Sequence, residues 1–351
     1  MFCGGHCRKS GFTSLGKIRY RCLSCGKTFI RKKLLPSTWK DFVDFYHLVK
    51  GKVNRELLIE QKAISRPTLS LKFKPFFDLP LPSEVVWKLL PPKLLSSNLP
   101  WVYGTDGKWF HRNGVILNHR DITNRENIWW SEHTGETRDA YHQDLLKLSK
   151  ITSIEHTPSG AVSDWNGGAV TGVASNFGHI PHQRCLVHVQ RKAKNLLPKK
   201  SSMKSVVDLR LIATEIIHLK DKIDVWNWQS LLTDWEKDNG ELLKLRTFGV
   251  NTKKKWWYTH GNLRRAWRLL TKDQEPFFVY LSTPGVPKTS NSLEGVNSNL
   301  KQKLGEHRGM KHAQQVSFAF WFYAFSRVKN PADLKKLWVG WKKSYNSKKA
   351  H

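Results

Sequence analysis

The pattern of hydrophobic and polar positions changes from helical to strand-like at Trp101. Short apolar runs rich in aromatic and β-branched residues predict strands over 101–105, 114–118 and 127–130. A helix is expected from about 138 to 149, then a short strand over 160–163, and a strand and helix pair around 185–197. Because strands alternate with helices in this way in α/β proteins, we predict an α/β core.

Helical patterns precede this core. Residues 37–78 have helical patterns, and the stretch 53–73 within them divides into two short helices around Ala63-Ile64-Ser65, which predicts a helix-turn-helix-like DNA-binding module. Ser65 is placed to cap the second helix, where Pro67 is tolerated in the first turn. A helical hairpin that only packs on the core is the alternative. The proline-rich residues 79–100 are interpreted as a linker.

Helical patterns also follow the first part of the core. Residues 199–286 are dense in lysine and tryptophan and carry few strand signals, so an all-helical insertion is expected. Helices are then expected from about Ser292 and from about Lys311. These boundaries make 101–198 and 287–330 the two parts of one core, and 331–351 a flexible basic C-terminal tail.

The balance of charge indicates a polyanionic partner. The chain has 351 residues and a formal net charge of +31, which favours nucleic acid as that partner. Its longest apolar run, Val316 to Phe325, is far shorter than the roughly 20 residues of a membrane-spanning helix. No apolar signal segment follows Met1, so we expect a cytoplasmic, nucleoid-associated protein that does not bind membranes.

Four of the five cysteines lie close to the N-terminus, as Cys3-x3-Cys7 and Cys22-x2-Cys25. In a reducing compartment, two close pairs of thiolates favour structural Zn²⁺ over disulfides. Residues 1–33 are therefore predicted to form a zinc ribbon, in which His6 is a competing ligand. Free thiols in a disordered basic arm are the alternative.

Three acidic residues stand out, although each has an ordinary structural explanation. Asp106 precedes a glycine at the expected end of the first strand, where it also suits a hairpin turn. Asp164 follows the short strand 160–163 and suits a turn or helix cap. Glu294 lies three residues after Asn291, as in a capping box.

Together these carboxylates indicate a different chemistry. Two strand-end aspartates and a glutamate on a helix are the ligands with which a polynucleotidyl transferase holds two Mg²⁺ ions, for which Mn²⁺ is a possible substitute. Lys301 lies seven residues beyond Glu294, on the same helix face, and is placed to steady a phosphate. A solvated lysine is the alternative for Lys301.

The order of motifs resembles one family, the Mutator-type transposases of bacterial insertion sequences, which have RNase H-like cores. The resemblance covers about residues 100–330. It is carried by four segments: Gly104-Thr105-Asp106-Gly107, Ser163-Asp164-Trp165-Asn166-Gly167-Gly168, Arg184-Cys185-Leu186-Val187-His188, and Asn291-Ser292-Leu293-Glu294-Gly295 followed by Lys301.

The resemblance implies that Asp106, Asp164 and Glu294 are catalytic metal ligands and that Cys185 and His188 are a supporting motif. The last pair is not assigned zinc, because two ligands leave a tetrahedral site half empty. The implied function is a DNA transposase whose partner is double-stranded DNA: it binds the terminal inverted repeats of its element, cleaves a phosphodiester and transfers the strand to target DNA. A homodimer or higher oligomer is expected in the synaptic complex.

The tryptophans of the insertion are expected to form mostly core. Trp256 and Trp257, followed by Arg264 and Arg265, combine aromatic faces with basic groups and are a candidate contact for a DNA end. Two other functions stay open: an inactive DNA-binding regulator derived from a transposase, and a structure-specific nuclease. Retention of all three carboxylates in a usable order favours an enzyme.

Overall fold

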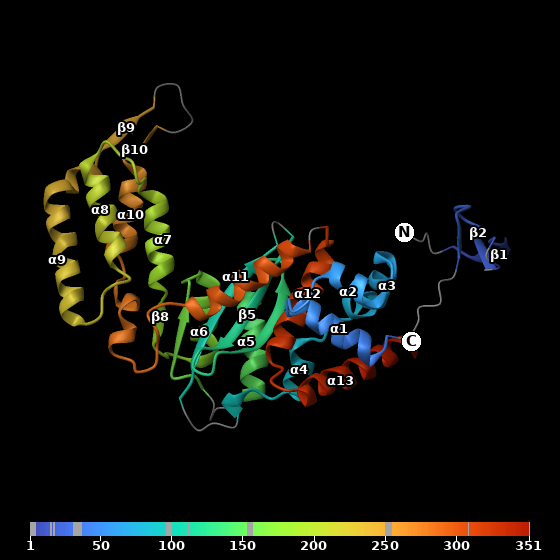
Figure 1. The fold of residues 1–351 in the computed structure, drawn as a ribbon. Coiled ribbons are helices and arrows are strands. Elements are labelled where there is room, and N and C mark those ends of the chain that lie inside the picture. Colours follow the sequence, from blue (N-terminus) through green and yellow to red (C-terminus); the bar gives the residue numbers. More distant parts are fainter. Residues whose placement is uncertain are drawn as a thin grey trace. The chain divides into compact units, whose positions relative to one another are not determined.

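The computed structural model describes residues 5–14, 16, 18–30, 37–95, 100–110, 113–152, 157–249, 255–307 and 309–350 (Figure 1). By its contacts the chain divides into two compact units. The first comprises 1–48 and 52–76, and the second comprises 49–51 and 77–351. Each is described by itself.

The first unit begins with a small antiparallel sheet in the order β1-β2-β3, formed by Cys7–Phe12, Ile18–Cys22 and Thr28–Ile30. Three helices follow, α1 (Trp39–Val49), α2 (Arg55–Lys62) and α3 (Arg66–Asp78). The two helices expected on either side of Ala63 are confirmed. Ala63 has a left-handed backbone with φ of 48°, which ends α2, and Ser65 Oγ accepts a hydrogen bond from Thr68 N at 3.3 Å to begin α3.

Aromatic packing holds these helices together. Phe45 of α1 packs on both Phe73 and Phe76 of α3, with ring centroids 5.3 Å and 5.0 Å apart. All three rings are fully or almost fully buried. Burial of such rings supplies a core that is large for so short a segment.

The second unit is built on a mixed five-stranded sheet in the order β6-β5-β4-β7-β8. Its strands are β4 (Val102–Trp109), β5 (Val115–Asp121), β6 (Glu126–His133), β7 (Gly160–Ser163) and β8 (His182–Arg184). The first three pair antiparallel as a meander, and β7 and β8 add parallel to β4. The predicted α/β architecture is confirmed at this level.

Helices cover the sheet and bring distant segments to it. Helix α5 (Arg138–Thr152) packs against α6 (Gly167–Phe177), where a side chain on Gly172 would meet Tyr141 Cβ at 2.8 Å. Helix α11 (Asn291–Glu306) contacts β4, and α12 (His312–Ser326) contacts β6. The close approach at Gly172 explains why a glycine is required there.

The segments interpreted as a linker and a flexible tail are partly helical and packed. Within 79–100 lie α4 (Ser83–Leu89) and the 3₁₀ turn η1 (Lys93–Leu95), and the tail forms α13 (Pro331–Ala350), which contacts α4. Trp87 and Trp341 are buried. The linker and flexible-tail interpretations were wrong. They gave weight to the prolines of 79–100 and the lysines of the tail and overlooked the apolar residues that form one face of each helix.

The insertion is a helical lobe with a hairpin (Figure 1). Its helices are α8 (Lys204–Glu215), α9 (Lys222–Asn239) and α10 (Gly261–Thr271), with 3₁₀ turns η3 (Gly240–Leu243), η4 (Glu275–Phe277) and η5 (Val279–Leu281). Helix α7 (Leu186–Leu196) shares their core, so the lobe begins before the predicted boundary at 199. Trp235 stacks on Trp267 at 4.9 Å in its core.

The insertion was expected to be all-helical, which is wrong, because β9 (Arg246–Phe248) and β10 (Trp256–Tyr258) pair antiparallel between α9 and α10. Among the helices of the described ranges, none combines the length and the hydropathy needed to cross a bilayer.

Candidate functional site

Asp106 lies within β4 rather than at a turn, opposite Asn118 of β5. The turn expected at Asp106 is therefore wrong: the strand continues to Trp109. Its Oδ1 accepts a hydrogen bond from Gly107 N at 3.0 Å, and Oδ2 accepts one from Asn297 Nδ2 of α11 at 2.7 Å. Helix α11 thus orients this carboxylate.

Asp164 follows β7, the strand directly beside β4. The parallel pairing joins 102–104 of β4 to 160–162 of β7, so Asp106 and Asp164 both lie just beyond the paired stretch. Asp164 Oδ1 accepts from Asn166 N at 2.9 Å, a local turn that the sequence also predicted. Trp165, which lies between Asp164 and Asn166 in the chain, has a φ of +66°, a strained backbone of the kind that occurs at functional sites.

Glu294 lies in the first turn of α11, but its side chain does not cap the helix. The helix begins after Ser290, which makes no capping bond through its side chain. Glu294 Oε2 instead accepts from Arg191 Nη2 at 2.9 Å, and Oε1 lies 3.5 Å from His188 Nδ1. The capping-box explanation of Glu294 is therefore wrong.

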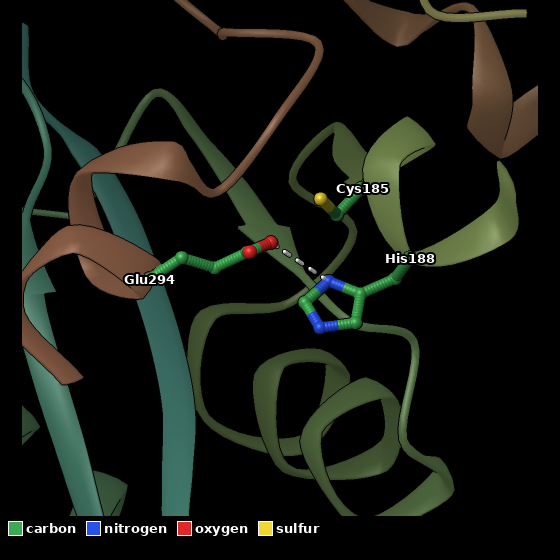
Figure 2. A group of neighbouring side chains, drawn as sticks. All are labelled: Cys185, His188 and Glu294. Atoms are coloured by element: carbon green, nitrogen blue, oxygen red, sulfur yellow. Dashed lines mark ion pairs between the residues drawn. The ribbon is translucent and has the colours of Figure 1, made fainter. Parts of the chain in front are cut away.

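Cys185 and His188 stand beside this glutamate. Figure 2 shows Glu294 pointing from α11 toward His188 and Cys185 at the start of α7. The sulfur, one imidazole nitrogen and one carboxylate oxygen lie within 4.8 Å of one another, the only such group of three among the described residues. Glu294 Oε1 and His188 Nδ1 are both buried and lie 3.5 Å apart as an ion pair.

Hydrogen bonding shapes the pKa values of the Cys185 and His188 pair. Burial raises the pKa of the Cys185 thiol, but hydrogen bonds from His188 and Ser290 outweigh it and leave that pKa below its usual value. Cys185 in turn raises the pKa of His188, with Glu294 adding to the effect. Cys185 and His188 are therefore close enough beside Glu294 to shift each other's pKa.

The charges of Asp164 and Glu294 act on the carboxylate of Asp106. Burial raises the pKa of Asp106 to about 6, opposed by the Asn297 hydrogen bond and reinforced by the negative charges of Asp164 and Glu294. The fold therefore brings the three acids together from β4, the end of β7, and α11. They do not form a group within 4.8 Å like that of Cys185, because Glu294 turns toward Arg191.

A fourth carboxylate, Glu136, was missed in the sequence. It lies in the loop between β6 and α5, where Oε1 accepts from Trp109 Nε1 at 2.8 Å and Oε2 from Asn166 Nδ2 at 3.0 Å. Burial and the nearby charge of Asp164 raise its pKa to about 7. The available signal was its position between a strand and a helix, the same kind of position as that of Asp164.

Two lysines stand close to each other near this group. Lys301 is exposed on α11, and burial together with the charge of Lys301 lowers the pKa of Lys108 on β4. Two neighbouring ammonium groups repel each other and favour an anion between them. The predicted phosphate contact of Lys301 stays a prediction.

The predicted zinc ligands lie in the small N-terminal sheet. Cys7 at the start of β1 is the register partner of Cys22 at the end of β2, and Cys25 follows in the next turn. Cys22 is buried, whereas Cys7 and Cys25 are exposed. Cys3 falls outside the described residues, so the fourth ligand is not placed.

The predicted DNA-end contact falls on the hairpin and on α10. Trp256 and Trp257 of β10 are 40% and 42% exposed. Arg264 stacks on Tyr258 at 4.1 Å, and Arg265 donates to Asn262 Oδ1 at 2.7 Å. The two arginines are therefore held by neighbours. The guanidinium of Arg246 lies over the Trp256 ring, 4.2 Å from its centroid, so one face of that tryptophan is covered.

The donor set of the four carboxylates suits a hard divalent cation. Carboxylate oxygens are the ligands that Mg²⁺ prefers, and both Asp106 and Glu136 have raised pKa values that a cation would reverse. Glu294 Oε1 is buried and lies 3.5 Å from His188 Nδ1. The donor types match those of a divalent metal, but no three of these four carboxylates bring ligand atoms within 4.8 Å of one another.

No protein-family model matches this chain, and no curated protein is detectably similar to it.

Proposed function

We propose that this protein is a metal-dependent DNA transposase with an RNase H-like core. The observation that carries the proposal is that Asp106, Asp164 and Glu294 come from three elements, and that the negative charges of Asp164 and Glu294 act on Asp106 and help to raise its pKa. The sheet supports it, because an antiparallel meander extended by parallel strands beside β4 places Asp106 on the central strand.

In this proposal Asp106, Asp164 and Glu294 hold two Mg²⁺ ions. When bound, such ions activate the attacking oxygen and stabilise the leaving oxygen in an in-line displacement. Asn297 orients Asp106 through its 2.7 Å hydrogen bond. His188 and Arg191 hold Glu294 in place until a cation and DNA compete for it.

The remaining residues would bind and position DNA. Lys108 and Lys301 form a cationic pair suited to a phosphate near the carboxylates. The exposed Trp256 and Trp257 of the hairpin would stack on bases of a distorted end. A net charge of +31 makes strong dependence of binding on salt an expected property.

Recognition of the element's inverted repeats is assigned to the N-terminal modules. Cys3, Cys7, Cys22 and Cys25 would hold structural Zn²⁺, and the helices of 37–78 would enter the major groove. Synapsis of two ends would use a homodimer or higher oligomer.

A second candidate is an inactive DNA-binding regulator. The observation in its favour is the Arg191–Glu294 ion pair at 2.9 Å, which satisfies Glu294 without any metal. The two candidates differ in a measurable way, because only the enzyme cleaves DNA when Mg²⁺ is added.

The experiment uses the full-length protein and a linear DNA that carries the inverted repeats flanking its own gene. Cleavage and strand transfer are followed on denaturing gels with Mg²⁺ or with chelator. Asp106→Asn, Asp164→Asn and Glu294→Gln should abolish cleavage and retain DNA binding, whereas Glu241→Gln, an exposed acid in the insertion, should cleave normally. Binding without cleavage by the unmodified protein would establish the regulator instead, and cleavage without strand transfer would establish a nuclease.

A further inference from the structure

A cavity of about 610 Å³ lies beside α11, within the second unit. Helix α11 contributes Asn291, Gly295 and Asn299 to its wall, and residues spaced by four lie on one side of a helix. Asn297, which donates to Asp106, is two residues from Gly295 and therefore points to the opposite side of α11. The cavity is thus separate from the carboxylates of the proposed catalytic group.

The wall of this cavity is cationic. Lys50, Arg120 and Arg125 belong to it, and the described residues that line it include no acid. The other polar side chains in the wall are asparagine amides and serine hydroxyls, which carry no charge. A wall of this kind attracts an anion and offers it hydrogen-bond donors.

Arg120 is the buried cation of the three, with an exposed fraction of 7%. Its Nε donates to Ser292 Oγ of α11 at 2.7 Å, and its Nη1 donates to Asn127 Oδ1 of β6 at 2.8 Å. A guanidinium has five N–H donors. Among the described residues Nη2 has no hydrogen-bond partner, and it stays accessible to solvent. Arg120 is therefore fixed by two elements and keeps donors for a ligand in the cavity.

The charges around Arg120 are not balanced within the cavity. Burial lowers the pKa of Arg120, and the charge of Arg125 lowers it further. Asp121 and Glu126 act in the opposite direction, but neither lines the cavity. Asp121 accepts hydrogen bonds within its own turn, and Glu126 pairs with Lys329. An anion in the cavity would reduce the repulsion between the two guanidinium groups.

Two further features of the wall indicate the kind of anion. Asn291 and Ser292 lie in the first turn of α11, where backbone N–H groups attract phosphate. Val296 and Phe322 add an apolar part to the wall. The volume is within the range of roughly 300–1,000 Å³ that is typical of sites for organic ligands. A phosphate ester, which joins an anion to an organic group, suits this wall better than a bare ion.

We infer that this cavity binds a phosphate group of a DNA strand, through Arg120, Arg125 and the first turn of α11. A strand is favoured over a free nucleotide because the net charge of +31 suits a polyanion. The inference shares with the proposed function only the premise that the protein binds DNA. It does not require cleavage, so the two can fail independently.

Gly295 allows a test that leaves every cation of the wall in place. A Cβ added there would meet no atom within 4 Å, so a larger side chain has room beside the cavity. Gly295→Glu adds a negative charge, and Gly295→Gln adds a group of the same size without charge. Both variants should fold, because replacing a glycine inside a helix favours the helix.

Arg125→Asn is the complementary variant, which removes one cation from the wall. Arg125 has a left-handed backbone with φ of 55°, which asparagine adopts more readily than most residues, so the turn should persist. Lys222→Gln is the matched control. It removes one positive charge from an exposed position at the start of α9.

Binding is measured by fluorescence anisotropy with the full-length protein in chelator. The probes are a labelled duplex that carries the sequence flanking the gene and a scrambled duplex of equal length. Gly295→Glu and Arg125→Asn should weaken binding to both duplexes about 10-fold, because a charged phosphate contact is lost whatever the bases are. Arg125→Asn should also lower the slope of log affinity against log salt by about 1. Gly295→Gln and Lys222→Gln should bind nearly as the unmodified protein does, and melting temperatures check folding.

The outcomes separate the inference from its rivals. Weaker binding of both duplexes by Gly295→Glu and Arg125→Asn, with Gly295→Gln and Lys222→Gln unaffected, supports it. Equal affinity of the two Gly295 variants, whether normal or reduced, overturns it.

Calorimetry with a deoxynucleoside 5′-monophosphate tests a free nucleotide as the ligand. Binding of that nucleotide that Gly295→Glu abolishes, together with unchanged DNA affinity, assigns the cavity to a small ligand and overturns the inference. An unmodified protein that binds neither duplex overturns both the inference and the proposed function. Binding that depends on the cavity without cleavage in Mg²⁺ supports the inference and overturns only the enzyme.

Discussion

Asp106→Asn should make the metal-free protein more stable, although it should abolish activity. Burial raises the pKa of Asp106 from its ordinary value of 3.8 to about 6. A folded-state pKa above the unfolded one means that stability is greatest below pH 3.8 and falls as pH rises to about 6. The loss is fully present at neutral pH, because the buried carboxylate is then charged.

The size of the effect follows from the same two values. A rise of the pKa from 3.8 to about 6 corresponds to about 3 kcal/mol of unfolding free energy lost above pH 6. Asparagine removes the charge and keeps one oxygen, which can accept the Asn297 hydrogen bond, but it loses the acceptor for Gly107 N, so the gain stays below the full value. The variant should therefore gain up to about 3 kcal/mol at pH 8 and show a flatter dependence on pH.

Urea unfolding at pH 8, followed by tryptophan fluorescence in chelator, measures this difference. Mg²⁺ should stabilise the unmodified protein and not the variant, because binding to the folded state adds stability. Asp234→Asn, an exposed position on α9, is the matched control and should change neither. A metal-free Asp106→Asn protein that is less stable than the unmodified one at pH 8 would refute the reasoning.

Three further predictions concern other parts of the molecule. Burial raises the pKa of Asp144, but hydrogen bonds from His119 and His133 outweigh it, so its stabilising effect is present above pH 3.8 and is lost only in stronger acid. Asp144→Asn should cost about 2 kcal/mol or more in urea unfolding at pH 7, and no loss there would contradict the network. Trp235→Ala should cost about 3–5 kcal/mol, measured by thermal unfolding of the lobe, because it removes the stack on Trp267. Trp257→Ala should weaken DNA binding about 10-fold in fluorescence anisotropy without changing the melting temperature, and equal affinity would exclude base stacking at this exposed residue.

Local patterns were sufficient for the helices and strands near the predicted site. The short strand 160–163 and the helix carrying Glu294 occur where they were expected. The start and end of such elements are set by residues that are close together in the sequence. The two short helices around Ala63 were likewise predictable. Predictions failed for α4 and α13, whose apolar residues are buried only because other helices pack on them, as Trp87 and Trp341 show.

The sequence by itself determined which residue types are available for chemistry: the charge of +31, the paired cysteines and the order of Asp106, Asp164 and Glu294. Only the tertiary structure decided which of them meet. It turned Glu294 toward His188 and added Glu136, whose place depends on contacts with Trp109 and Asn166 far away in the chain. The physical reason is that spacing along a chain constrains residues within one element, whereas the distance between elements is set by packing and by the absence of a side chain at Gly107.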